Sequence, residues 1–196
     1  MKYRNRSHST DELVRRFHFL LGKRNIFFAF WWGVKLGSKI KFDGKCYFKR
    51  FPGSTIKIGN NCKLKSRTVS NLIGINHPCI ISTQEPDAII EIGNNCGFSG
   101  TVIGAFKSIK IGNNVRCGAN TLITDSDWHT DDPRAGQPKE VVIGNNVWLG
   151  VNAIILKGVT IGDNTLIGAN SVVVKSIEAN VIAAGNPCHV ISKITV

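Results

Sequence analysis

A short polar segment around residue 129 concentrates the side chains that could do chemistry. It reads Thr124-Asp-Ser-Asp-Trp-His-Thr-Asp-Asp-Pro-Arg134, so a single histidine is surrounded by carboxylates, an indole and a guanidinium. Imidazole changes protonation near neutral pH, so His129 could take a proton from a hydroxyl while a neighbouring carboxylate fixed the ring. General-base catalysis of this type contributes about 10²–10⁴ in rate. A solvated histidine without a role is the simpler interpretation of an arbitrary loop, and the surrounding sequence decides between the two.

The segment interrupts a six-residue repeat. Apolar residues recur at Ile143, Leu149, Ile155, Ile161, Ile167 and Val173, most of them followed by glycine. Four positions after each apolar residue stands a small or β-branched one: Val147, Ala153, Val159, Thr165, Ser171 and Ile177. Hexapeptide periods are typical of β-helices. Because three six-residue sides make one turn of a triangular prism, we expect the apolar residue to point inward, the glycine to make the corner and the small residue to fill the narrowing interior.

The repeat extends upstream through a recurring corner sequence. Ile-Gly-Asn-Asn begins at Ile58, Ile92, Ile111 and Ile143, and Ile-Gly-Asp-Asn begins at Ile161. The interval of 18 residues from 143 to 161 equals one turn. The interval of 19 residues from 92 to 111 is one turn with one extra residue, and the interval of 34 residues from 58 to 92 is two residues shorter than two turns. The 32 residues from 111 to 143 are one turn with a surplus. We therefore predict about seven to eight turns, with an excursion loop over residues 124–140 on a rigid scaffold.

Residues 1–36 lack the repeat and are basic and aromatic, and we expect one or two short helices there. The favoured interpretation is a capping segment whose aromatic face packs on the first turn and covers its open strand edges. The alternative is a membrane-surface anchor, because Trp and Phe beside Lys and Arg suit a bilayer interface. The apolar run 26–32 is too short to span a bilayer and does not fit a secretory signal.

Composition predicts one domain over residues 37–196 behind that capping segment. The 196 residues carry a formal net charge of +12, with the basic residues concentrated in the first 70 positions, which favours anionic partners. Without a recognisable nucleic-acid module, anionic lipid or a phosphorylated small molecule is favoured over nucleic acid. The six cysteines include no Cys-x-x-Cys pair, and Cys62, Cys96 and Cys117 fall at inward positions of the repeat. We expect reduced core thiols and a cytoplasmic protein.

Metal chemistry is disfavoured. A β-helix can hold a catalytic zinc ion in carbonic anhydrases, but that site needs several histidines brought together. The histidines here are His8, His18, His77, His129 and His189, and no two in the repeat region lie close in sequence. We predict no catalytic metal.

Residues 37–192 resemble the hexapeptide-repeat acyltransferases, near the maltose and galactoside acetyltransferases and those of capsule and lipopolysaccharide synthesis. The resemblance rests on segments 125–129, 142–150, 155–164 and 167–173 and on the ending Ala-Gly-Asn-Pro-Cys. It implies an all-β solenoid, a left-handed parallel β-helix that forms a homotrimer with active sites between subunits. It also implies that His129 deprotonates the acceptor, which attacks acetyl-coenzyme A directly.

The same resemblance implies roles for further residues. Acceptor contacts are expected from Asp127, from Trp148 beside the cleft, and from Ser99, which stands where the sugar acetyltransferases have asparagine. The coenzyme A groove is expected along Val151, Ala169, Val174 and Lys175, with Lys193 as a second cation for phosphate. Related enzymes often have arginine after the Pro-Cys pair, whereas this chain has His189.

The predicted function is therefore an acetyl-coenzyme A-dependent O-acetyltransferase that acts on a saccharide hydroxyl in the synthesis of a cell-surface glycan such as capsule, lipopolysaccharide or exopolysaccharide. Its expected location is the cytoplasm, with peripheral contact to the inner face of the membrane through the N-terminal segment. Two alternatives stay open: an N-acetyltransferase acting on an amino-sugar nucleotide, and a non-catalytic solenoid scaffold.

Overall fold

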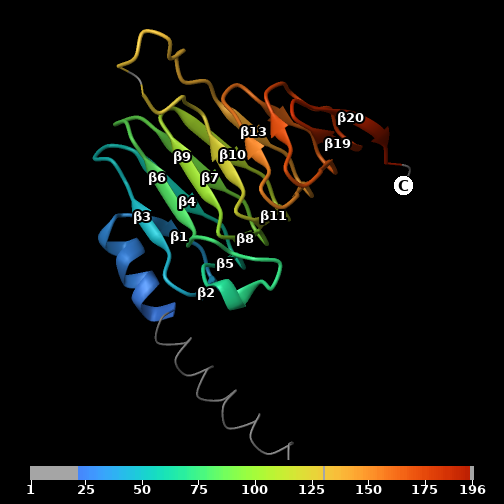
Figure 1. Cartoon of the computed structure of the whole chain (residues 1–196). Helices are drawn as coiled ribbons and strands as arrows, with labels where there is room; N and C mark the ends of the chain where they lie inside the picture. Colours follow the sequence, from blue (N-terminus) through green and yellow to red (C-terminus); the bar gives the residue numbers. More distant parts are fainter. Residues whose placement is uncertain (1–21, 130, 195–196) are drawn as a thin grey trace, which may run out of the picture.

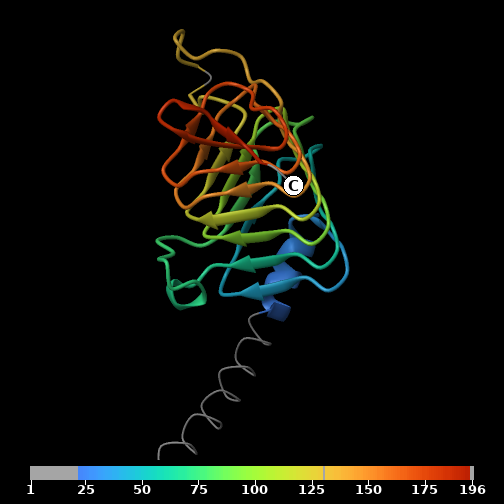
Figure 2. The same ribbon diagram turned by 90° about the vertical axis from the view of Figure 1, so that its right-hand side faces the viewer.

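The chain winds into a three-sided prism of short parallel strands. The structure is a computed structural model that describes residues 22–129 and 131–194. Each turn contributes one strand to each of three sheets, which we call A, B and C, and hydrogen bonds run from turn to turn (Figures 1 and 2). The fold class predicted from the hexapeptide repeat is confirmed, and the chain is a left-handed parallel β-helix.

The strands of each sheet succeed one another along the prism. Sheet A contains β1 (Lys35–Leu36), β4 (Thr55–Ile58), β7 (Ile89–Ile92), β10 (Ser108–Ile111), β13 (Val141–Ile143) and β16 (Thr160–Ile161). Sheet B contains β2 (Lys41–Asp43), β5 (Lys63–Lys65), β8 (Gly97–Ser99), β11 (Arg116–Ala119), β14 (Trp148–Leu149), β17 (Leu166–Ile167), β19 (Val181–Gly185) and β20 (Cys188–Lys193). Sheet C contains β3 (Tyr47–Lys49), β6 (Ile80–Thr83), β9 (Val102–Ala105), β12 (Leu122–Thr124), β15 (Ile154–Ile155) and β18 (Val172–Val173). Only β20 runs antiparallel, and it pairs with β19 at the C-terminal end.

The strand register corrects one of the predicted turn intervals. Ile58 pairs directly with Ile92, so the interval between them is one turn with an insertion and not two short turns. The inserted residues 66–79 leave the wall between β5 and β6 and include the 3-10 helix η1 (Thr68–Ser70). Sheets A and C each have six strands, and sheet B has seven parallel strands before the antiparallel β20, so sheet B reaches the lower end of the seven to eight turns expected.

A helix over residues 22–31 covers the first turn of the prism (Figure 1). It docks through Asn25, whose Nδ2 donates to the carbonyl oxygen of Gly44 (2.7 Å) and whose Oδ1 accepts from the amide of Cys46 (3.0 Å). Ala29 is fully buried beside it. The corner at Gly44 presents backbone polar groups that need partners, which an amide side chain supplies and an aromatic ring does not.

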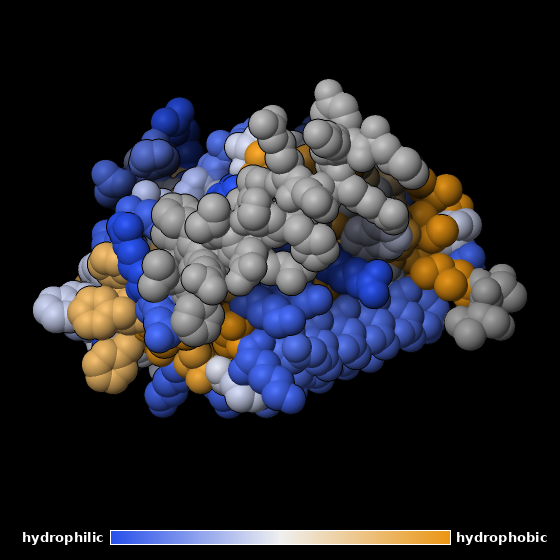
Figure 3. Space-filling view, turned by 90° about the horizontal axis from the view of Figure 1, so that it is seen from below, coloured by the Kyte–Doolittle hydropathy of each residue, from blue (hydrophilic) through white to orange (hydrophobic). Residues whose placement is uncertain are grey.

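Most large apolar side chains of this helix point away from the prism, so the prediction that they pack on the first turn is wrong for them; Phe28 is half-buried in a hollow beside sheet C, and residues 1–21 of the predicted capping segment lie outside the described residues. Four of the outward-pointing side chains form what we call the aromatic helix face: Ile26 (50% exposed), Phe27 (59%), Phe30 (78%) and Trp31 (73%). Figure 3 shows hydrophobic side chains projecting at the end of the molecule where the helix lies. None of the helices in the described ranges is long and apolar enough to cross a bilayer.

The interior is filled by columns of side chains stacked from turn to turn, and each sheet contributes a column of mostly large residues beside further buried ones such as Ile56, Ile90 and Ile109 on sheet A. Sheet A supplies Ile58, Ile92, Ile111, Ile143 and Ile161; sheet B supplies Phe42, Leu64, Phe98, Cys117, Leu149, Ile167 and Ala183; sheet C supplies Phe48, Ile81, Ile103, Ile123, Ile155 and Val173. Burying one large aliphatic or aromatic side chain contributes about 1.5–3 kcal/mol, so these columns stabilise a rigid wall. All six cysteines are free and buried, which confirms their interpretation as core residues.

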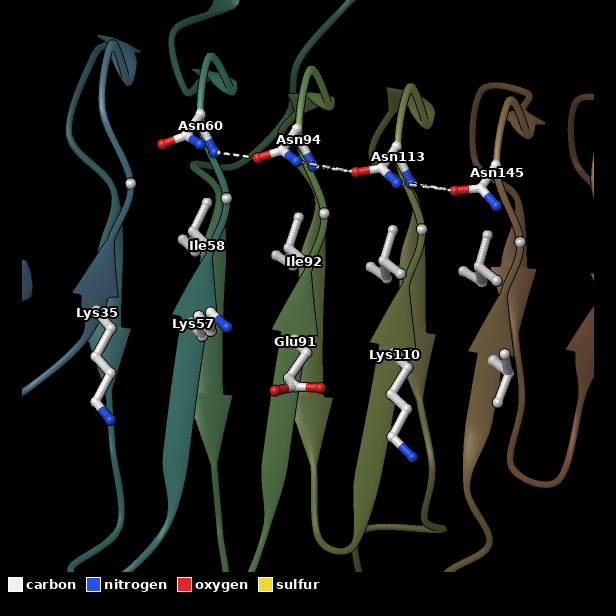
Figure 4. Close-up of a pocket in the computed structure, with 18 of the residues that line it drawn as sticks. Lys35, Lys57, Ile58, Asn60, Glu91, Ile92, Asn94, Lys110, Asn113 and Asn145 are labelled. Atoms are coloured by element: carbon white, nitrogen blue, oxygen red, sulfur yellow. Dashed lines mark hydrogen bonds between the residues drawn. The ribbon is translucent and has the colours of Figure 1, made fainter.

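The corners between sheets A and B use asparagine where we expected glycine to supply the turn conformation. In the Ile-Gly-Asn-Asn sequences the residue with positive φ is the second asparagine, for example Asn95 at 60° and Asn114 at 58°. Glycine is required for a different reason, because a Cβ on Gly93 would lie 2.6 Å from the carbonyl oxygen of Gly112 on the next turn. The first asparagines are hydrogen-bonded from turn to turn, with Asn94 Nδ2 donating to Asn113 Oδ1 (3.2 Å; Figure 4). Close stacking of turns thus demands glycine, and the bend demands asparagine.

Candidate active site

The loop that carries the predicted catalytic residue leaves the prism at the corner between sheets C and A. It connects β12 to β13 and projects beyond the wall, at the top of Figure 1. Ile111 on β10 pairs directly with Ile143 on β13, so the wall continues unbroken beneath the loop. The loop is therefore an addition to a rigid scaffold.

Asp125 fastens the start of the loop to the preceding turn. Its side chain is fully buried, and its carboxylate accepts hydrogen bonds of 2.7 Å from the backbone amides of Phe106, Lys107 and Ser108. These amides form the turn between β9 and β10, which would otherwise contain unpaired donors. Asp125 is thus a structural residue with no contact to the histidine ring.

Asp127 fastens the outer part of the loop to the following turn. Its carboxylate forms an ion pair with the ammonium group of Lys157 and accepts from the amide of Gly136 (3.0 Å), while Lys157 Nζ also donates to the Gly136 carbonyl (3.1 Å). The hydrogen bond from Lys157 holds the pKa of the Asp127 carboxyl below its ordinary value. The ion pair therefore persists above that pKa and is lost as the pH falls through it. Asp127 is predicted to bind substrate, and its contacts in a single chain are those of a loop anchor.

Trp128 covers the outer face of sheet C, a role that the sequence analysis missed. Its φ is 68°, its Nε1 donates to Thr124 Oγ1 (2.9 Å), and its ring stands edge-on to Phe106 at 5.5 Å. A Cβ on Gly104 would lie 2.4 Å from the indole, so glycine makes room for it. In the sequence, Gly104 at an outward position of its strand was the signal that could have indicated an aromatic side chain packed on this face. The indole seals the loop against the wall and leaves the next residue projecting.

His129 lies exposed beyond that indole. Its amide donates to the Asp127 carbonyl (2.9 Å) and its own carbonyl accepts from Asp132 (3.1 Å), so the backbone is held in a turn. Within residues 22–129 and 131–194, no side chain is hydrogen-bonded to its ring. The expectation of an orienting carboxylate in the same chain is therefore not met. Asp132 instead binds Arg134 (2.9 and 2.6 Å), which lowers the pKa of the Asp132 carboxyl.

The two remaining acceptor residues lie on sheet B, the side of the prism opposite the corner that carries the loop (Figure 1). Ser99 is only 7% exposed, and its Oγ accepts from Asn71 Nδ2 (3.3 Å) in the excursion 66–79. Trp148 is 53% exposed and pairs in register with Arg116 and Leu166. One chain therefore does not bring Ser99 or Trp148 to its own His129.

The residues expected to hold coenzyme A are distributed over the C-terminal turns. Val151 and Ala169 lie at the corner between sheets B and C, after β14 and β17. Val174 and Lys175 follow β18, on the same edge as the loop and two turns further along, and both are exposed. Lys193 lies exposed on β20. These positions form no single enclosed pocket in the described part of one chain.

Two of the hollows on the surface can be compared with the predicted site. A groove of about 740 Å³ runs along sheet A past Lys57, Glu91 and Lys110 and the asparagine corners, and it contains none of the predicted site residues (Figure 4). A second hollow of about 610 Å³ lies between the helix and sheet C, with Trp32 and Trp128 in its lining. No group of three or more His, Cys, Asp or Glu suited to a metal ion occurs among residues 22–129 and 131–194.

Comparison with known proteins supports the fold. Residues 140–175 match the protein family described as Bacterial transferase hexapeptide (six repeats). No curated protein sequence matches the chain.

Among solved structures, the chain is similar to AntD, an N-acyltransferase from Bacillus cereus in complex with dTDP and 3-hydroxybutyryl-CoA, with a TM-score of 0.60, 20% identity, and 83% of this chain and 85% of that chain covered. A variant of AntD bound to dTDP-4-amino-4,6-dideoxyglucose and coenzyme A gives a TM-score of 0.59 and 20% identity over 83% and 84% of the two chains. A maltose O-acetyltransferase from Clostridium difficile 630 gives a TM-score of 0.50 and 25% identity over 94% and 86%. The chain therefore carries transferase hexapeptide repeats and has the left-handed β-helix fold of hexapeptide-repeat acyltransferases.

Proposed function

We propose that the protein is an acetyl-coenzyme A-dependent O-acetyltransferase that acts on a saccharide hydroxyl, with His129 as the general base. The observation that carries the proposal is an exposed imidazole on a loop anchored to the preceding turn by Asp125 and to the following turn by Lys157. A catalytic group must be held within reach of its substrate, and a loop fixed to a solenoid provides that. The similarity to a maltose O-acetyltransferase supports the reaction class.

The transfer is direct. His129 accepts the proton of the acceptor hydroxyl as the hydroxyl oxygen attacks the thioester carbonyl carbon, which forms a tetrahedral intermediate. Collapse of the intermediate breaks the carbon–sulfur bond, and the imidazolium returns the proton to the departing thiolate. The products are an acetyl ester and coenzyme A, and the histidine is regenerated without an acyl-enzyme.

The described residues fit an elongated, anionic cosubstrate. A Cβ on Gly150 would lie 2.5 Å from the amide nitrogen of Ala169, so small residues keep the corner close-packed and leave the exposed backbone around Ala169 open to a ligand. Lys175 and Lys193 are exposed cations that suit phosphate groups. Val151 and Val174 offer apolar contact for the pantetheine arm.

The proposal includes a homotrimer with each active site between two copies. The argument is geometric: His129 lies at the corner between sheets C and A, whereas Trp148 and Ser99 lie on the opposite side of the same prism. A neighbouring copy that presents sheet B to this corner would bring the two sets together. A head-to-tail interface of this kind forms a closed ring when its rotation closes after three copies.

Transfer to nitrogen is the second candidate, because AntD is an N-acyltransferase and is similar to this chain over most of its length. The test is to incubate the purified protein with acetyl-coenzyme A and either a glycan oligosaccharide or an amino-sugar nucleotide, and to follow thiol release and product mass. We expect an ester on the oligosaccharide. An amide on the amino sugar as the only product would assign N-transfer, and failure to bind coenzyme A at all would leave a non-catalytic scaffold.

We further propose that the enzyme works in the cytoplasm at the inner face of the membrane, where it modifies a precursor of a cell-surface glycan. The aromatic helix face is exposed, and Asp43 is the only acidic residue between positions 22 and 67, a stretch rich in Lys and Arg. Aromatic side chains beside basic ones suit an interface with anionic lipid, where each Lys or Arg near the surface contributes about 1 kcal/mol.

Vesicle sedimentation tests this contact. The protein should sediment with vesicles that contain phosphatidylglycerol, and a Phe30→Ser/Trp31→Ser variant should lose about tenfold or more in affinity, because these are the two most exposed apolar residues of the helix. Leu72→Ser is the matched control, since Leu72 is 91% exposed on the excursion 66–79. Equal sedimentation of the double variant and the native protein would refute the membrane contact.

A further inference from the structure

Gly97 is a glycine that neither the backbone conformation nor the packing around it requires. It begins β8 and faces outward, because the next residue, Phe98, is buried in the core. Its φ is not positive, and a Cβ added to it would meet no atom within 4 Å. The glycines of neighbouring strands differ, since a Cβ on Gly104 or Gly118 would lie 2.4 Å from Trp128 or 2.7 Å from the Val151 amide. A glycine inside a strand often marks a place where a ligand approaches the backbone closely.

Cationic side chains surround this open position. Gly97 pairs with Lys63 on the preceding turn and with Arg116 on the following turn, and neighbouring strands lie about 4.8 Å apart. Lys65, two residues after Lys63, faces outward on the same sheet and pairs with Ser99. The missing side chain leaves a hollow of about 430 Å³ whose lining includes Lys63, Lys65, Ser99 and Arg116.

The positive charge of this hollow is only partly balanced within the chain, because Lys65 stands opposite Asp43 on β2 while Lys63 and Arg116 have no carboxylate directly opposite them. None of Lys63, Lys65 and Arg116 forms an ion pair with any residue in the ranges 22–129 and 131–194. Lys63 also stands directly opposite Lys41 on β2, and like charges in such cross-strand pairs are destabilising. A phosphate or carboxylate in the hollow would turn this repulsion into charge-assisted hydrogen bonds.

An aromatic surface lies next to the hollow. Trp148 pairs in register with Arg116 one turn further along, and it is 53% exposed. Its indole offers an apolar face against which a sugar ring can pack. Trp148 and Gly97 are separated by two turns, about 10 Å, which suits a sugar joined to an anionic group.

We infer that sheet B binds the acceptor as an anionic saccharide, with its phosphate or carboxylate over Gly97 and its sugar ring against Trp148. This inference rests on the proposed function for the identity of the reaction, and it adds the class of acceptor. Coenzyme A also carries phosphates, but the residues expected to hold it, such as Ala169 and Lys175, lie on turns after the loop, whereas Gly97 lies on a turn before it. The cationic hollow is thus assigned to the acceptor.

The test compares glucose 1-phosphate with methyl glucoside by isothermal titration calorimetry on the full-length native protein. Glucose 1-phosphate should bind at least tenfold more tightly, and Arg116→Gln or Lys63→Gln should each weaken its binding by about tenfold, the effect of losing one hydrogen bond between charged groups. Gly97→Leu should abolish binding by filling the hollow. Lys57→Gln, the same charge change on sheet A, should have no effect, and all four variants should bind coenzyme A as the native protein does.

Three other outcomes would decide against the inference. Equal affinity for the two sugars would refute an anion subsite, and loss of coenzyme A affinity in Arg116→Gln would assign the hollow to the cosubstrate phosphate. A change of oligomeric state in Gly97→Leu, measured by light scattering, would show that another copy covers the hollow. The binding assay requires no acetyl transfer, so a protein that binds glucose 1-phosphate but transfers nothing would refute the proposed function and leave this inference standing.

Discussion

Replacing His129 with alanine should lower kcat for acetyl transfer by about 10²–10⁴, which corresponds to about 3–5 kcal/mol of lost transition-state stabilisation. The loss is expected because His129 is the one imidazole among the described residues of the loop, and three of the loop acids, Asp125, Asp127 and Asp132, are engaged with backbone amides, Lys157 and Arg134. Steady-state thiol release with acceptor and acetyl-coenzyme A measures it. The KM for acetyl-coenzyme A should change little, since the ring acts on the acceptor.

The fold should survive this substitution. His129 is exposed and its ring has no hydrogen bond to a side chain in the described residues, so the free energy of unfolding should change by less than about 0.5 kcal/mol. His189→Ala is the matched control, because His189 is also exposed and contacts only the carbonyl oxygen of Pro187 through its ring (3.2 Å). Retention of native kcat in a folded His129→Ala protein would mean that another group takes the proton.

Replacing Asp125 with alanine should remove both stability and activity. The change leaves three backbone donors, the amides of residues 106–108, without their acceptor, and the amide of Ser108 is buried. Hydrogen bonds to a charged group contribute about 1.5–3 kcal/mol each, but three that share one carboxylate are not additive, so we expect a loss of about 3–5 kcal/mol overall. For a chain of this size the Tm should fall by about 10 °C. Thermal unfolding followed by circular dichroism, with thiol release below the new Tm, measures both effects.

Asp131→Ala provides the comparison for Asp125→Ala, because Asp131 is an exposed acid in the same loop. Its Tm should stay within about 1 °C of the native value. An unchanged Tm in Asp125→Ala would show that water can replace the carboxylate at these amides, and the proposed anchoring of the loop would then be wrong.

The loop and its histidine could be predicted because an interruption of a strict repeat is visible as a change in spacing. The interval 111–143 was interpreted correctly as one turn with an insertion, and Ile111 does pair with Ile143. The interval 58–92 was not, because its length happens to fall close to two turns, and only the pairing of Ile58 with Ile92 reveals the excursion 66–79. Length alone cannot separate a turn of wall from a loop of similar length.

Contacts with backbone groups and with other turns could not be predicted from the sequence either. Asp125 and Asp127 look alike in a run of acids, yet one is buried on three amides and the other is paired with Lys157. The N-terminal segment was expected to dock through its aromatic residues, and it docks through Asn25. In both cases the partner is a main-chain group or a side chain on another turn, and its position depends on the assembled prism.

The sequence by itself determined the repeat, the inward columns, the three-sided wall and the projecting histidine, because each follows from a local period or its interruption. Only the tertiary structure decided which acids hold the loop, which way the aromatic helix face points, and that His129 and Trp148 lie on opposite sides of one prism. The physical reason is that a period of six specifies which residues face inward within a turn. Contacts between turns and across corners depend on where insertions leave the wall, and no local period records that.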